Sequence, residues 1–272
     1  MRITVAMLER QYSKLTATMA AEKRVRRNAY FGRNFLINAS SLVLITTATK
    51  PPDGVHALEM TNVAKRKVTA KAAIFFWSAL GVKKIIVADA TGQTLLEESE
   101  VLLLNNMEVE IEQIEYLQDN RLVIQKGKGY GEGALIKYAL QKSQLLKNEN
   151  SFFKCTGKVY CRNFAEIFDL IQTNNIKNIF WRDALKSSTI DTRFFYVSKD
   201  FCNNVLLPVF ESIDDKNNTT MEHAVMNAAR QRMIQGTSIR PMLSGFSGGM
   251  DKPYFDSSLG FLDQNLPCWV SQ

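Results

Sequence analysis

Short apolar runs of strand length alternate along the chain with segments in which apolar residues recur every three or four positions. The helical spacing is clearest over residues 72–80 and 164–171. The runs expected to form strands are residues 42–47, 84–89, 109–112, 152–155, 178–181 and 193–197. This order of elements predicts an α/β fold in which a mainly parallel sheet is flanked by helices.

In such a fold, ligands bind beyond the carboxyl ends of the parallel strands. We expect strands to end at Thr47, Asp89, Gln125 and Cys155, so the segments that follow these residues should carry the functional site.

The N-terminal region differs from the rest of the chain in its charge. Residues 1–38 contain eight Lys or Arg and two Glu, and so carry six of the chain's seven net positive charges. Apolar residues within 5–19 follow helical spacing, and a basic cluster occupies 23–27. We expect a basic amphipathic helical arm over 1–38, followed by a single domain over 39–272. The arm could bind an anionic membrane surface, or dock on its own domain or on a second subunit of a homo-oligomer.

Composition excludes several classes of protein. The chain is 46% hydrophobic and 22% charged, values of a globular protein. No apolar run approaches 18 residues, so no membrane-spanning helix is predicted. The four cysteines form no C-x-x-C pair and only two histidines are present, which argues against a zinc site and favours the reducing cytoplasm. Because the chain outside the arm is almost neutral, we do not expect nucleic acid as a partner.

A glycine-rich segment over residues 126–133 precedes a predicted helix. Glycines allow close approach of a ligand to the backbone, and a helix N-terminus presents free N–H groups to an anion. The spacing fits neither a Walker loop nor a dinucleotide-binding fingerprint. The alternative interpretation is a tight connection between a strand and a helix. Glu132 could accept a hydrogen bond from a sugar hydroxyl, or simply cap the helix.

Lys154 and Lys158 bracket a predicted strand end that also contains Thr156 and Gly157. An ammonium about 4 Å from a phosphate oxygen gains roughly 4 kcal/mol at an effective dielectric of about 20, before desolvation is subtracted. Two such groups could neutralise a diphosphate without a metal ion.

Several sequence blocks, taken in order, resemble those of bacterial glycosyltransferases of surface-polysaccharide (O-antigen or capsule) biosynthesis. The blocks are residues 46–49, 89–92, 129–132, 154–158, 191–195, 221–223 and 244–249, which together span about residues 41–255. The sequence departs from the family pattern at Lys158, where an arginine is expected. Lysine keeps the charge but not the bidentate geometry of arginine.

The resemblance implies a glycosyltransferase-A-like fold, a nucleotide-sugar donor and a glycan or lipid-linked glycan acceptor at the inner face of the plasma membrane. Many enzymes of that fold hold a metal through an Asp-x-Asp pair. Here Asp214 and Asp215 are adjacent and precede a polar turn, which suits the start of a helix better. We therefore expect transfer without a metal or other cofactor, with Lys154 and Lys158 in place of the cation.

The resemblance also suggests roles for individual residues. Glu222 is the preferred catalytic base, although it could merely favour the start of its helix. Asp191 is the reserve candidate, with Arg193 as its partner or as a phosphate contact. The donor-binding residues would be Thr47, Thr49, Asp89, Thr91, Gly129, Gly131, Glu132, Lys154, Thr156, Gly157, Lys158 and Arg193. Ser244, Ser247 and Gly248 could form a lid over the donor, or could simply end a strand.

Two other functions are compatible with the same sequence. A parallel sheet and a glycine-rich segment also occur in nucleotide-dependent Rossmann-like methyltransferases and oxidoreductases. A non-catalytic, membrane-associated scaffold would explain only the basic arm.

Overall fold

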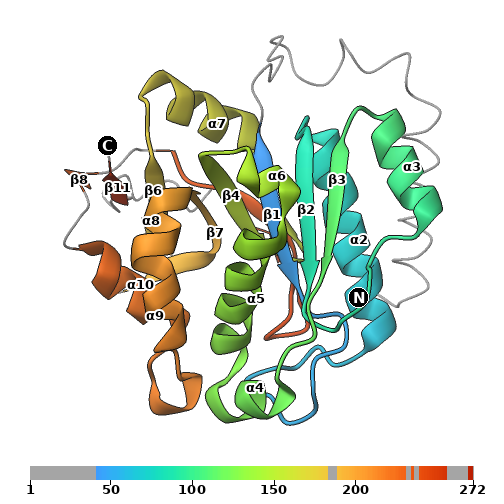
Figure 1. Cartoon of the computed structure of the whole chain (residues 1–272), viewed down its shortest axis with the longest axis vertical. Coiled ribbons are helices and arrows are strands. Elements are labelled where there is room, and N and C mark those ends of the chain that lie inside the picture. Colours follow the sequence, from blue (N-terminus) through green and yellow to red (C-terminus); the bar gives the residue numbers. More distant parts are fainter. Residues whose placement is uncertain (1–40, 183–188, 231–233, 236–238, 256–268, 272) are drawn as a thin grey trace.

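A computed structural model shows an α/β fold built around a central β-sheet (Figure 1). The structure describes residues 41–182, 189–230, 234–235, 239–255 and 269–271. The predicted arm over residues 1–38 lies outside these ranges.

The main sheet has the strand order β3-β2-β1-β4-β7-β6-β11-β8. From β3 to β6, only β7 runs against the other strands. The prediction of an α/β fold with a mostly parallel sheet is therefore confirmed. The strands are β1 (Leu42–Thr47), β2 (Lys84–Asp89), β3 (Glu110–Glu115), β4 (Ser151–Thr156), β6 (Asn178–Arg182), β7 (Ile190–Ser198), β8 (Ile234–Gln235) and β11 (Trp269–Ser271).

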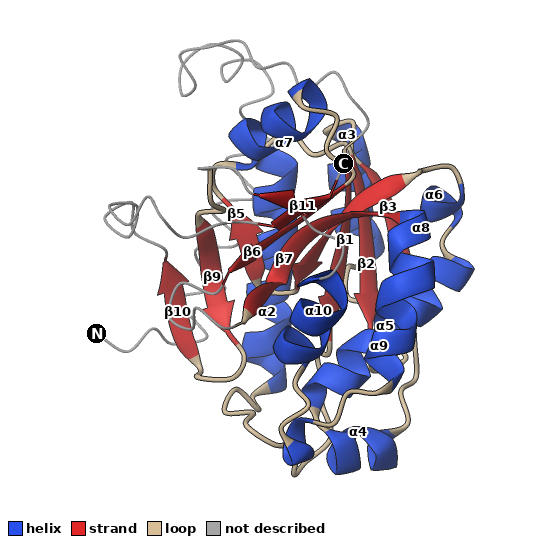
Figure 2. Ribbon diagram, turned by 90° about the vertical axis from the view of Figure 1, so that its left-hand side faces the viewer, coloured by secondary structure: helices blue, strands red, loops and turns tan. Residues whose placement is uncertain are grey.

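Helices cover both faces of this sheet (Figure 2). Alternate residues of β1 pack on opposite sides: Val43 joins a core with α2, α3 and α7, and Leu44 joins a core with α5, α9 and α10. The helices are α2 (Val63–Ala79), α3 (Glu98–Asn106), α4 (Asn120–Lys126), α5 (Lys128–Lys142), α6 (Gln144–Lys147), α7 (Phe164–Thr173), α8 (Lys199–Phe201), α9 (Leu207–Glu211) and α10 (Met221–Arg230). The short turns η1 (Cys202–Leu206) and η2 (Asp215–Asn217) connect α8 to α9 and α9 to α10.

A second, smaller sheet has the order β10-β9-β5 and is antiparallel. Its strands are β5 (Val159–Cys161), β9 (Leu243–Ser247) and β10 (Lys252–Phe255). Strand β5 follows β4 after the two-residue turn Gly157–Lys158, so the small sheet begins at the carboxyl edge of the main sheet.

Two expectations about the middle of the chain are wrong. Residues 120–126 form helix α4 and not a strand ending at Gln125, because Asp119 accepts hydrogen bonds from the first N–H groups of that segment. The glycine-rich segment is not a loop, since α5 already begins at Lys128. Helix α2 also begins earlier than expected, at Val63, where the side chain of Asn62 caps it.

The glycines of α5 allow neighbouring segments to approach closely. At Gly133, a Cβ atom would lie 2.6 Å from Cβ of Phe210 in α9, and at Gly129 it would lie 2.8 Å from a carboxylate oxygen of Asp215. Glycine is therefore required here by packing and not by turn geometry.

Replacing Gly133 with alanine should destabilise the fold by about 1–2 kcal/mol, since overpacking of a dense core outweighs the helix propensity gained. Urea unfolding measures this loss. In a Phe210→Gly background, which lacks the Cβ atom that clashes, Gly133→Ala should cost less. Additive losses in the double variant would contradict a direct clash.

Candidate functional site

A pocket of about 560 Å³, here called the strand-end pocket, opens at the carboxyl edge of the main sheet. Strands β1, β2 and β4 end at this edge, and the antiparallel strand β7 begins there. The pocket is also lined by the start of α5, the start of α10 and the turn between β9 and β10. It thus lies where ligands of parallel sheets bind.

Two buried cationic side chains, Lys158 and Arg66, line one side of the pocket. Both lie beside Gly248: a Cβ atom there would be 3.5 Å from Nζ of Lys158 and 3.6 Å from Nη1 of Arg66. Within the described part of the chain, no hydrogen bond or ion pair reaches Nζ of Lys158. Burial, followed by the charge of Arg66, lowers the pKa of Lys158 to about 7. The pocket therefore offers two adjacent cations to an anionic ligand.

Arg66 was missed in the sequence. Its Nε donates to the carbonyl of Ala48 at 2.6 Å and its Nη1 donates to the carbonyl of Met60 at 2.8 Å, so it links the two ends of the 48–60 loop. Burial lowers its pKa. One signal was available: Arg66, Thr69 and Ala70 share a helix face that is buried, and an arginine on such a face needs a specific partner.

The pocket is also lined by carboxylates. Glu222, in the first turn of α10, accepts a hydrogen bond from Oγ1 of Thr192 at 3.2 Å. Asp215, in η2, accepts one from the backbone N–H of Gly129 at 2.9 Å. Burial raises the pKa of Asp215, and the nearby charge of Glu222 raises it further.

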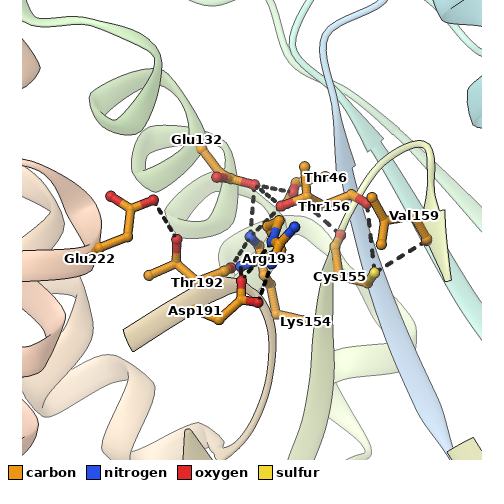
Figure 3. A network of polar contacts seen from close by, with 10 residues as sticks. All are labelled: Thr46, Glu132, Lys154, Cys155, Thr156, Val159, Asp191, Thr192, Arg193 and Glu222. Atoms are coloured by element: carbon orange, nitrogen blue, oxygen red, sulfur yellow. Dashed lines mark hydrogen bonds and ion pairs between the residues drawn. The ribbon is translucent and has the colours of Figure 1, made fainter. Parts of the chain in front are cut away.

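A hydrogen-bonded network runs from Glu132 through Lys154 and Thr192 to Glu222 (Figure 3). Oε1 of Glu132 accepts from Thr46 at 2.6 Å, from Thr156 at 3.1 Å and from Nζ of Lys154 at 2.8 Å. Burial raises the pKa of Glu132, but Lys154 and the two hydroxyl donors outweigh it, and the net shift is downward. Glu132 lines the pocket as an ionised, fixed carboxylate.

Lys154 does not line the strand-end pocket, although the sequence suggested a phosphate contact for it. Its side chain is fully buried, and besides Glu132 it donates to Oγ1 of Thr156 at 2.9 Å and to the carbonyl of Thr192 at 2.7 Å. Thr192 in turn holds Glu222. Lys154 therefore connects the two glutamates from behind the pocket wall.

Asp191 is also set back from the pocket. Its carboxylate forms a two-point ion pair with Arg193, at 2.8 Å to Nε and 2.5 Å to Nη2, and accepts from the Arg193 backbone N–H. Arg193 lines the pocket and Asp191 does not. The structure thus places Arg193 as the pocket residue and Asp191 as its anchor.

The predicted donor-binding residues at the β2 end are internal as well. Asp89 accepts hydrogen bonds from the backbone N–H groups of Thr49 and Thr91, at 3.0 and 2.8 Å, and from the Thr91 hydroxyl. These three residues tie two loops together and do not line the pocket, whereas Thr47 does. Gly157 lies behind Thr47, whose Cβ atom would be 2.7 Å from an added Cβ.

Gly129 and Gly131 line the pocket, but the start of α5 is already occupied. The N–H of Gly129 is bonded to Asp215, the chain's own carboxylate at the place where a phosphate was expected. Asp215 had no assigned role in the pocket because its position 86 residues further along the chain gives no signal of the contact.

The predicted lid residues divide between two positions. Ser247 and Gly248 line the pocket. Ser244 is buried inside β9, paired with Tyr160 of β5. The β9–β10 turn is fastened to the 48–60 loop, since the N–H of Met60 donates to the carbonyl of Gly248 at 3.1 Å.

No protein-family model and no curated protein matches this sequence. Over the described ranges, no helix is long and apolar enough to cross a membrane. The same ranges contain no group of three or more His, Cys, Asp or Glu side chains placed to hold a metal ion.

Proposed function

We propose that the protein is a glycosyltransferase of bacterial surface-polysaccharide biosynthesis, which moves a sugar from a nucleotide-sugar donor to a glycan or lipid-linked glycan acceptor. The observation that supports this most is the pairing, in one strand-end pocket, of the cations Lys158 and Arg66 with the carboxylate Glu222. The mostly parallel sheet is compatible with the glycosyltransferase-A-like fold that the sequence blocks imply.

The cationic side suits the diphosphate of the donor. Each cation about 4 Å from a phosphate oxygen contributes roughly 4 kcal/mol at an effective dielectric of about 20, before desolvation is subtracted. Lys158 and Arg66 are already desolvated, so part of that cost is met on folding. In this proposal Arg66 takes the role that the sequence suggested for Lys154, and Arg66 together with Lys158 in its charged form makes a metal ion unnecessary.

The acidic side suits the acceptor hydroxyl. Glu222, oriented by Thr192, removes the hydroxyl proton as the acceptor oxygen bonds to the anomeric carbon. The bond from that carbon to the diphosphate breaks, and its electron pair leaves with the diphosphate beside Lys158 and Arg66. Attack opposite the leaving group inverts the anomeric carbon. Glu132, fixed through one oxygen, is placed to accept a hydrogen bond from a sugar hydroxyl through the other.

The competing Rossmann-like dinucleotide or S-adenosylmethionine enzyme is less well supported. Such enzymes place a pyrophosphate or carboxylate at a glycine-rich helix start, and in this chain Asp215 occupies the start of α5. A cytoplasmic enzyme at the inner face of the plasma membrane, held there by the basic arm, completes the proposal.

A thermal-shift titration tests the proposed donor class. UDP, GDP, CDP or dTDP should raise the melting temperature, because a ligand at 100 times its Kd stabilises the native state by about 2.7 kcal/mol. The shift should be the same with EDTA and with manganese. NAD and S-adenosylmethionine serve as the contrasting ligands.

Stabilisation by NAD or S-adenosylmethionine alone would overturn the glycosyltransferase proposal. A nucleotide shift that EDTA abolishes and manganese restores would leave the donor class standing and disprove transfer without a metal.

A further inference from the structure

A second hollow, here called the tyrosine groove, lies between helices α5 and α9, which run side by side in Figure 1. Its volume of about 480 Å³ is within the range of about 300–1,000 Å³ typical of ligand sites. The α5 residues that line it form a single helix stripe at spacings of three and four. They are Tyr130, Gly133, Ala134, Lys137, Tyr138 and Gln141.

The shape of the groove follows from residue size. Gly133 and Ala134 leave room at the base, where Gly133 meets Phe210 of α9. Tyr130 and Tyr138 rise from α5 on either side of this base, and Tyr116, which follows β3, joins them. A row of small residues between large aromatic ones produces a hollow with aromatic walls.

The aromatic rings are held in place before any ligand arrives. The rings of Tyr116 and Tyr138 are 4.8 Å apart between centroids, and Nζ of Lys126 lies 4.6 Å from the centre of the Tyr130 ring. Ordered tyrosines lose little conformational entropy on binding. The groove is therefore preorganised.

The polar groups of the three tyrosines and of Gln141 have no partner among the residues that the structure describes. No hydrogen bond reaches the hydroxyls of Tyr116, Tyr130 and Tyr138 or the amide of Gln141. The phenols lie close enough together that Tyr130 and Tyr138 both contribute to the raised pKa of Tyr116, after burial. Three tyrosines and a glutamine that line one hollow thus have unused hydrogen-bonding capacity.

A glycan matches this chemistry. The C–H faces of sugar rings pack against aromatic side chains, and their hydroxyls donate to and accept from phenols and amides. Lys137 and Glu211 at the groove are bonded to each other at 2.6 Å, and the ammonium of Lys126 lies over the Tyr130 ring, so the lining carries only a single net positive charge. A purely apolar ligand would leave the phenols and the amide unpaired.

The tyrosine groove is separate from the strand-end pocket. Helix α5 lies between them, with Gly129, Glu132 and Leu135 facing the pocket and Tyr130, Lys137 and Tyr138 facing the groove. A polymer that enters one site could therefore also contact the other around the start of α5.

We infer that the tyrosine groove binds an oligosaccharide segment of the acceptor glycan, away from the hydroxyl that reacts. The role of this glycan as the acceptor rests on the proposed function. Glycan binding itself does not depend on transfer.

Saturation-transfer NMR with chitotetraose, maltotetraose and cellotetraose tests the inference on the full chain. At least one of these tetrasaccharides should bind the wild-type protein. Tyr138→Ala should weaken that binding about tenfold or more, as expected for an aromatic anchor. Tyr138→Phe, which removes only the hydroxyl, should weaken it about two- to tenfold. Gln141→Ala provides a second groove variant on an exposed side chain.

Gln172→Ala, at an exposed glutamine of α7 that lines neither the groove nor the strand-end pocket, is the matched control for Gln141→Ala, and it should leave tetrasaccharide binding unchanged. Failure of all three probes to bind, or binding unaffected by both Tyr138→Ala and Gln141→Ala, would overturn the inference. Loss of binding in Glu222→Gln alone would place the glycan in the strand-end pocket and would overturn it too. Glycan binding without any nucleotide-induced thermal shift would leave the groove standing and remove the proposed donor.

Discussion

Replacing Glu222 with glutamine should lower kcat for sugar transfer by about 10²- to 10⁴-fold, the usual contribution of a general base. Glutamine keeps the size of the side chain and can still accept the hydrogen bond from Thr192, but it cannot take up the acceptor proton. Affinity for nucleotide diphosphates should stay within about twofold of wild type, because Glu222 is not among the charges that shift the pKa of Lys158 or of Arg66. Steady-state kinetics with the best donor of a nucleotide-sugar screen measure both quantities.

Asp191→Asn is the comparison for this variant, since Asp191 was the reserve base. The ion pair with Arg193 predicts that its loss changes donor KM more than kcat. Transfer by Glu222→Gln within a few fold of wild type, together with a large loss of kcat in Asp191→Asn, would move the base to Asp191. Near-normal kcat in both variants would argue for a retaining reaction.

Replacing Lys158 with methionine should weaken binding of nucleotide diphosphates by roughly 10- to 150-fold, the value of a charged hydrogen bond lost. Methionine has a similar length and no charge, and the backbone φ of +78° at this position is equally demanding for both residues. The fold should be as stable as wild type or more so, because a buried, unpaired ammonium is removed. Calorimetric titration and thermal melting separate the two effects.

The pH dependence gives an independent check on Lys158. Its pKa is about 7 in the folded chain and about 10.5 when exposed, so the unfolded state binds more protons over this interval and stability rises with pH. A bound diphosphate favours the charged lysine, and its affinity should therefore fall as pH rises through 7. Lys158→Met should lose both trends. Lys137→Met, which removes an ammonium in the tyrosine groove, should keep them. A pH profile unchanged in Lys158→Met would remove Lys158 from the diphosphate site.

Much of the sheet could be predicted from the sequence because buried parallel strands leave continuous apolar runs. Residues 42–47 and 84–89 form β1 and β2 within the predicted bounds. The strand ends also identified Thr47, Thr156 and Lys158 as pocket residues. The local sequence pattern predicts the surroundings of a residue where these depend on its position in its own strand.

Lys154 shows where this reasoning stops. It lies two positions before the end of β4, and its side chain points from the sheet to Glu132 of α5, whereas Lys158 lies beyond the strand end in the turn to β5. Both are lysines in one short block. Lys154 pairs with the carboxylate of Glu132 and Lys158 lines the pocket only because they lie at different positions relative to the end of the strand. Which of the two positions is covered depends on the segments that pack against the strand end, and these lie elsewhere in the sequence.

The glycines of α5 were misread for a related reason. Glycine-rich composition favours turns, yet these glycines lie in a helix. Neighbouring segments occupy the space that their side chains would fill. Arg66 and Asp215 were missed because their contacts, with loop carbonyls and with a helix start far along the chain, are tertiary.

The contact between Asp215 and the start of α5 constrains how this protein can change in evolution. A Cβ atom at Gly127, where φ is +100°, would lie 2.4 Å from a carboxylate oxygen of Asp215. Homologues that keep an acid at 215 should therefore keep glycine at 127, and those with a side chain at 127 should carry a smaller residue at 215. The two positions should vary together, although 87 residues separate them in the chain.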